Sequence, residues 1–153
     1  MTLGERMSDT RAVEILLVED NPQDLELALR ALRKANLSNR IEIARDGAEA
    51  IAFLFCEGQY AGRRIEDGPR VVLLDLKLPK VDGLEVLRRI KGDPRTAGTP
   101  VVVLTSSKEQ SDVIESYQLG ANSYIVKPVN FERFATAVQQ LGMYWLLLNE
   151  PPQ

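Results

Sequence analysis

A chain of 153 residues, with 44% hydrophobic and 27% charged residues, has the size and composition of one ordinary globular domain with its own core. Its net charge of -3, with no basic patch, argues against nucleic acid or an anionic membrane as a partner. The absence of histidine excludes histidine-based catalytic triads and histidine-bound metal sites, so any phosphohistidine chemistry needs a second molecule.

The beginning of the chain and its cysteine content bear on location. Residues 1–12 are polar and predict a flexible leader with no secretory signal. No apolar run approaches the roughly 20 residues that a membrane-spanning helix needs. The single cysteine, Cys56, excludes an internal disulfide and fits a reducing compartment. We therefore expect a cytoplasmic protein.

Strand and helix patterns alternate five times along the chain. Short apolar or alternating runs predict strands at 15–18, 41–43, 71–74, 101–104 and 123–126. Helical spacing of apolar residues predicts helices that begin near Asn21, Asp46, Leu84, Ser107 and Asn130. This alternation is typical of an α/β, doubly wound, flavodoxin-like fold with a five-stranded parallel sheet in the order 2-1-3-4-5 and helices on both faces. We expect this domain to span 13–150, with an extended last helix, followed by a tail over 151–153.

Four of the predicted strands lead into residues that can bind a cation or a phosphoryl group. These residues are Glu19, Asp20, Asp75, Thr105 and Lys127. Ligands of open parallel sheets bind beyond the carboxyl ends of the strands, so these side chains are expected to converge. Three adjacent acids repel one another unless a hard cation such as Mg²⁺ or Mn²⁺ neutralises them.

The chemistry of the predicted cluster is phosphoryl transfer. Asp75 is the best nucleophile, because a carboxylate can accept a phosphoryl group as an acyl phosphate. Lys127 and Thr105 can contact the oxygens of that group. Each residue also has a plainer interpretation, with Asp20 as a helix cap, Thr105 as a turn hydroxyl and Lys127 as a surface charge. Their joint occurrence at one end of several strands favours the shared site.

In this order, the segments resemble the receiver domain of two-component response regulators. The segments that carry the resemblance are 19–21, 75–83, 105–106 and 124–128, and it extends over about 14–141. It implies that Asp75 is the phosphoacceptor, loaded from a phosphohistidine on a partner histidine kinase. It also implies Mg²⁺ bound by Asp20, Asp75 and the main-chain carbonyl of Lys77, with Glu19 acting largely through water.

The resemblance also assigns a switch and a backbone feature. Thr105 and Tyr124 are similar to the family's switch pair, in which the aromatic ring turns inward after phosphorylation. The peptide bond between Lys127 and Pro128 is expected to be cis. Such a protein is not an enzyme, although it has self-phosphorylation and autodephosphorylation chemistry.

Lys77 departs from the common family pattern, because a smaller or uncharged residue usually follows two positions after the phosphoacceptor. Its side chain can lie over the phosphoryl group or point away from it. With Ser107, two residues after Thr105, it is a candidate for tuning the lifetime of the phosphoaspartate.

The resemblance implies output through protein contacts, because no output domain is recognised. The long loop over 57–69 and the ending at 144–148 are similar to those of stand-alone regulators that partner phytochrome-type histidine kinases. A phosphorelay intermediate or a phosphate sink is the alternative to a direct effector.

The end of the last predicted helix is apolar nearly all round. This pattern predicts a homodimer through that helix, together with the helix that begins near Ser107 and the strand at 123–126. The alternative is that the helix end folds back on its own domain. The candidate dimer residues are Tyr144, Trp145, Leu146, Leu147 and Leu148.

Two other functional classes share parts of the pattern. A flavin-binding electron carrier of the same fold needs a phosphate cradle after the first strand, where Glu19 and Asp20 would repel a phosphate. A metal-dependent phosphatase with an aspartyl nucleophile usually has a second acid where this chain has Lys77. Both classes fit the sequence less well than a phosphoryl-accepting switch.

Overall fold

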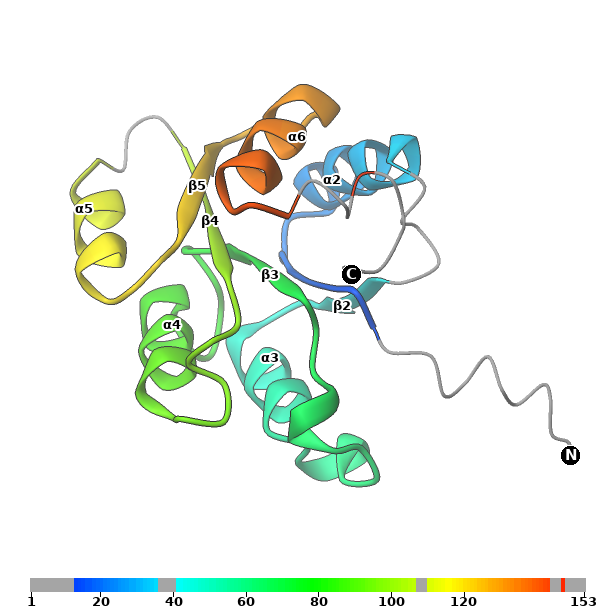
Figure 1. The fold of residues 1–153 in the computed structure, drawn as a ribbon, viewed down its shortest axis with the longest axis vertical. Coiled ribbons are helices and arrows are strands. Elements are labelled where there is room, and N and C mark those ends of the chain that lie inside the picture. The colour runs from blue at the N-terminus through cyan, green and yellow to red at the C-terminus, as the bar shows by residue number, and fades with distance from the viewer. Residues whose placement is uncertain (1–12, 36–40, 107–109, 144–146, 148–153) are drawn as a thin grey trace, which may run out of the picture.

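Five parallel strands form the centre of the molecule (Figure 1). The structure, a computed structural model, describes residues 13–35, 41–106, 110–143 and 147. The strand order is β2-β1-β3-β4-β5, so the predicted fold class and strand order are confirmed. The strands are β1 (Ile15–Val18), β2 (Ile41–Ala44), β3 (Val71–Asp75), β4 (Val101–Thr105) and β5 (Ser123–Val126).

Helices cover both faces of this sheet. Figure 1 shows α2 and α6 on one face and α3 and α4 on the other, with α5 beyond β4 and β5. Two 3₁₀ turns, η2 (Gly58–Tyr60) and η3 (Ile65–Asp67), lie within the predicted long loop after α3. The helices are α2 (Pro22–Lys34), α3 (Gly47–Leu54), α4 (Gly83–Gly92), α5 (Gln110–Gln118) and α6 (Phe131–Gln140).

Apolar side chains on both faces of the central strands build two cores. Strands β1, β3 and β4 are buried along their whole length, as expected for a parallel sheet covered on both sides. Alternate residues point to opposite faces, so Leu17 packs with Leu32 and Phe134, while Leu16 packs with Phe53. The cores therefore fix the register of the sheet, and with it the level at which each strand ends.

Polar caps begin three of the helices directly after strands. The side chain of Asn21 accepts a hydrogen bond from the Asp24 N–H at 2.9 Å, and Pro22 occupies the first helical position, as predicted. Asn130 caps α6 in the same way. These short connections keep the first turns of α2 and α6 close to the carboxyl ends of β1 and β5.

The last helix is shorter than predicted. It ends at Gln140, so the prediction of one continuous helix to Leu148 is wrong. Gly142 adopts a left-handed φ of +72°, and the Met143 N–H bonds back to the Val138 carbonyl at 2.8 Å. This is the hydrogen bond of a Schellman motif, which ends a helix by turning the chain away from its axis.

The predicted dimer residues fall mostly outside the part of the chain that is described. Leu147 is half-buried and packs against the core beneath α2 and α6, in agreement with the alternative that this segment folds back. Tyr144, Trp145, Leu146 and Leu148 lie outside the described residues, as do the leader and the tail. Within the described residues, none of the helices combines the length and apolar character needed to cross a bilayer.

Glycine at position 83 permits the close packing of α4 on the strand that carries Asp75. A Cβ atom at this position would lie 2.4 Å from the Asp75 carbonyl oxygen and 2.5 Å from the Leu76 Cα. Both are backbone atoms, which cannot move aside as a flexible side chain can. A Cβ atom at Gly92, in the same helix, would have nothing within 4 Å.

We expect Gly83→Ala to lower the free energy of unfolding by about 1–3 kcal/mol, because the added methyl group forces the backbone apart. The matched control, Gly92→Ala, should be neutral or slightly stabilising, since alanine favours a helix over glycine. Urea unfolding of both variants measures the difference. Equal effects of the two substitutions would contradict the assigned packing.

Candidate functional site

The carboxyl ends of four strands bring the predicted site residues to one edge of the sheet. Asp75 and Thr105 are the last residues of β3 and β4. Glu19 and Asp20 follow β1, and Lys127 follows β5. Parallel pairing in register places these strand ends side by side, although the residues are far apart in sequence.

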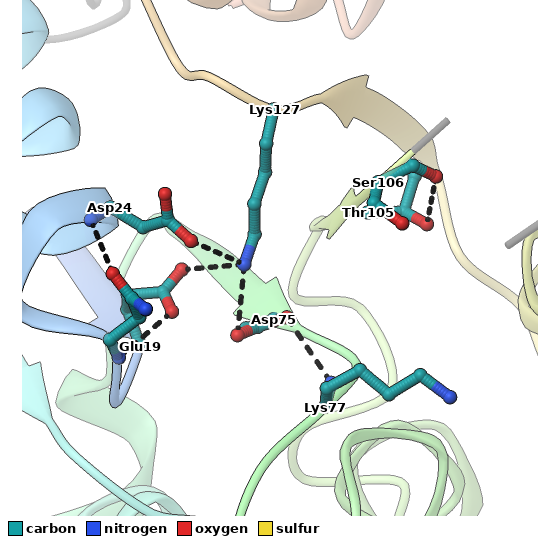
Figure 2. Close-up of polar contacts among 8 residues, drawn as sticks. Glu19, Asp24, Asp75, Lys77, Thr105, Ser106 and Lys127 are labelled. Carbon is teal, nitrogen blue, oxygen red and sulfur yellow. Dashed lines mark hydrogen bonds and ion pairs between the residues drawn. The ribbon is translucent and has the colours of Figure 1, made fainter. Parts of the chain in front are cut away.

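The ammonium group of Lys127 lies among three carboxylates (Figure 2). Its Nζ atom is 3.1 Å from Asp75 Oδ2, 3.2 Å from Glu19 Oε1 and 3.1 Å from Asp24 Oδ2. The side chains of Glu19 and Asp75 are 1% and 4% exposed, so both carboxyl groups are almost fully removed from water. An ammonium group at this short range makes the burial of these carboxylates possible.

The protonation of the site reflects this crowding. Burial raises the pKa of Glu19 to about 8, with further increases from the hydrogen bond and the charge of Asp75 and a smaller decrease from Lys127. Burial also opposes the charge on Lys127, but the carboxylates of Asp75 and Glu19 outweigh it and raise the pKa of Lys127. Lys127 therefore stays charged, whereas burial and the neighbouring Asp75 favour the protonated form of Glu19.

Three acids in the cluster fit a divalent cation. Glu19, Asp20 and Asp75 each offer a carboxylate oxygen, and these oxygens lie within 4.8 Å of one another. Glu19 and Asp75 are buried, whereas Asp20 is exposed. Hard oxygen ligands, one of them open to solvent, suit Mg²⁺, which retains several waters. A bound cation would favour the charged forms of these acids. The predicted carbonyl ligand from Lys77 stays a prediction.

Lys77 points away from the phosphoacceptor candidate. Its main-chain N–H donates to Asp75 Oδ1 at 3.2 Å, while its Nζ atom pairs with Asp112 Oδ2 of α5, also at 3.2 Å. Figure 2 shows the side chain directed away from Asp75. Of the two orientations left open by the sequence, the structure has the one in which the Lys77 side chain points away from Asp75. Ser107, the second tuning candidate, lies outside the described residues.

The predicted switch residues occupy neighbouring strands with opposite exposure. Thr105 is 1% exposed, and its hydroxyl donates to the Ser106 carbonyl at 3.1 Å. Tyr124 is 44% exposed, and its ring meets that of Tyr117 edge-on, with the centroids 6.0 Å apart. The aromatic ring thus lies on the surface beside α5, and the switching role of the pair stays a prediction.

The backbone around Lys127 is held by hydrogen bonds from two directions. The Lys127 N–H donates to the Thr105 carbonyl at 2.8 Å. Arg133 of α6 donates to the carbonyls of Val126 and Pro128 at 3.0 and 3.1 Å. The peptide bond between Lys127 and Pro128 is cis, as predicted. These contacts fix the point from which the lysine side chain extends toward Asp75.

Asp24 is the site residue that the sequence analysis missed. It lies in the first turn of α2, where it was not distinguished from an ordinary acidic residue near a helix N-terminus. Its position four residues after Asp20, in the first turn of a helix that directly follows a predicted site residue, could have identified it as a candidate. A helix that begins directly beyond β1 places its first turn beside the site.

Comparison with known proteins agrees with this geometry. Residues 15–139 match the response regulator receiver domain. The chain belongs to this family. It is a two-component response regulator, as the order of its motifs indicated.

Individual relatives are similar over most of their own length. A probable methanogenesis regulatory protein, FilR2 of Methanothrix harundinacea, is 45% identical over 139 residues, which cover 90% of this chain and 86% of the relative. Response regulator Rcp1 of Synechocystis is 43% identical over 134 residues, which cover 86% of this chain and 88% of Rcp1.

Solved structures show the same arrangement. The bacteriophytochrome response regulator AtBRR has 55% identity and a TM-score of 0.80, with 92% of this chain and 99% of AtBRR covered. The Mn(2+)-bound form of Rcp1 has a TM-score of 0.69 at 40% identity, with 91% and 98% covered. The family and its fold are therefore shared by proteins of similar size.

Proposed function

We propose that Asp75 accepts a phosphoryl group from the phosphohistidine of a partner histidine kinase, with Mg²⁺ bound beside it. The observation that carries this proposal is the contact of 3.1 Å between the Lys127 ammonium and a buried Asp75 carboxylate, within a cluster of acids suited to a cation. A carboxylate and a fixed cation side by side are what an incoming phosphoryl group needs.

The residues of this chain have distinct roles in the transfer. A carboxylate oxygen of Asp75 forms a bond to phosphorus while the bond between phosphorus and the histidine nitrogen breaks, and the imidazole leaves on the kinase. The Lys77 N–H orients the Asp75 carboxylate, to which it donates at 3.2 Å. Lys127 offers its charge to a phosphoryl oxygen, which spreads the negative charge of the transferring group.

Glu19, Asp20 and Asp75 would hold the Mg²⁺ ion, with Glu19 acting largely through water. When bound, the ion supplies positive charge to the acids and to the phosphoryl oxygens. Support comes from the acid cluster and from the related Rcp1, which has been solved in a Mn(2+)-bound form. The identity of the ion as Mg²⁺ is part of the proposal.

The protein acts as a stoichiometric acceptor and not as an enzyme, and it returns to its starting state when water hydrolyses the acyl phosphate. Thr105 and Tyr124 form the switch, since they lie on adjacent strands between the site and the surface beside α5. The proposed partner is a phytochrome-type histidine kinase. Its support is the 55% identity to AtBRR, a bacteriophytochrome response regulator.

Treatment with acetyl phosphate and Mg²⁺ tests the acceptor role. We expect wild-type protein to gain the mass of one phosphoryl group, and to lose it again at alkaline pH, because acyl phosphates are labile. Asp75→Asn should gain nothing, and neither should wild-type protein in EDTA. Intact-protein mass spectrometry measures all three samples. A phosphorylated Asp75→Asn protein would refute the assignment of the acceptor.

We also propose a homodimer in which α5 and β5 take part. Ile114, Tyr117 and Tyr124 are 55%, 45% and 44% exposed and lie on these two elements, so an apolar surface is available there. Sedimentation at micromolar concentration should give a dimer for wild type and a monomer for Ile114→Asp. The control, Leu27→Asp, changes an exposed leucine of α2 and should leave the dimer intact. A wild-type monomer would contradict this proposal.

A further inference from the structure

Asp24 contacts Lys127 but does not belong to the group of acids that could hold a metal ion. Its Oδ2 atom is 3.1 Å from Lys127 Nζ, a separation that Figure 2 marks as a direct contact. The two residues are 103 positions apart in sequence, so only the fold brings them together. The backbone of Asp24 is itself held, because its N–H donates to the capping side chain of Asn21 at 2.9 Å.

The three carboxylates around Lys127 are not equivalent. Glu19 and Asp75 belong to the group of acids whose oxygens could hold a metal ion, whereas Asp24 does not. Oxygens that turn toward a cation become poorer partners for an ammonium group, because the cation repels it. Asp24 is therefore the carboxylate that can remain paired with Lys127 when the cation is bound.

The ion pair between Lys127 and Asp24 is partly buried, which strengthens it. The Lys127 side chain is 18% exposed and that of Asp24 is 32% exposed, so water screens this contact less than it screens an ordinary surface ion pair. A flexible lysine side chain that lost all its partners would sample many rotamers away from Asp75.

We propose that Asp24 is a positioning residue, which keeps the Lys127 ammonium at the site while Glu19 and Asp75 bind the cation. This inference rests on the proposed function, in which Lys127 contacts an oxygen of the phosphoryl group. Asp24 itself touches neither the cation nor the phosphoryl group in this account. It acts through Lys127.

A plainer role for Asp24 predicts different results. An acidic residue in the first turn of a helix stabilises that helix through its dipole. In that case Asp24→Asn would lower the stability of the fold slightly, and its effect on phosphorylation would not depend on Lys127. A double-variant cycle with Lys127→Met separates the two roles.

The test measures the rate of phosphorylation by acetyl phosphate at saturating Mg²⁺. We expect Asp24→Asn to slow the wild-type reaction by about three- to tenfold, because the asparagine oxygen can still accept a hydrogen bond from Lys127 and only the strengthening by the negative charge is lost. Asp24→Glu should recover part of the rate. Lys127→Met should be slow, and adding Asp24→Asn to it should slow it no further. Glu26→Gln is the matched control, because it removes a charge from α2 that pairs with Arg30 and Arg33, and its rate should equal that of wild type.

A second readout needs no phosphoryl donor. At saturating Mg²⁺, the ¹⁵N signal of the Lys127 ammonium, identified by its loss in Lys127→Met, should be sharp in wild type and broadened by proton exchange in Asp24→Asn. An Asp24→Asn protein with the wild-type rate and the wild-type signal would overturn the role of Asp24 and leave the proposed function standing. So would an additional loss of rate in the Lys127→Met background. A wild-type protein that takes up no phosphoryl group would overturn both.

Discussion

The ion pairing between Lys127 and the buried carboxylates is the interaction on which the site depends. Asp75 and Glu19 are both almost completely withdrawn from water, and each has the lysine ammonium within 3.2 Å. Removing one partner from such a group leaves an uncompensated buried charge, which is far more costly than losing a surface pair. Even with the lysine present, burial and the neighbouring Asp75 raise the pKa of Glu19 to about 8, so the charged form of Glu19 is disfavoured. A cation bound beside these acids would favour their charged forms.

The two hydrophobic cores determine where these charges lie. Leu16 and Leu17 point to opposite faces of the sheet and fix the register of β1, so that Glu19 follows at the level where β3 ends in Asp75. Gly83 lets α4 pack against the backbone of Asp75 itself. On the other side, Arg133 ties the turn after β5 to α6. The packing that stabilises the domain therefore also determines where the polar side chains of the site lie.

Much of this arrangement could be predicted from the sequence, because strand periodicity and strand-end chemistry are local signals. The fivefold alternation of strands and helices predicted the sheet order, and the polar residues at the ends of four strands predicted the convergence of acids and lysine. Contacts that depend on the direction of a side chain were harder to predict. The pairing of Lys77 with Asp112 decides between two orientations that the sequence left open. The length of the last helix was overestimated, because apolar periodicity continues past Gly142, where the left-handed backbone turns the chain.

The most direct test of the account is a crystal structure of the protein with Mg²⁺ and beryllium trifluoride, which mimics a phosphoryl group on a carboxylate. The account predicts the beryllium group on a carboxylate oxygen of Asp75, the metal ion bound to Asp20 and Asp75, and the Lys127 ammonium in contact with a fluorine atom. An unmodified Asp75, or a Lys127 side chain turned away from the bound group, would contradict it.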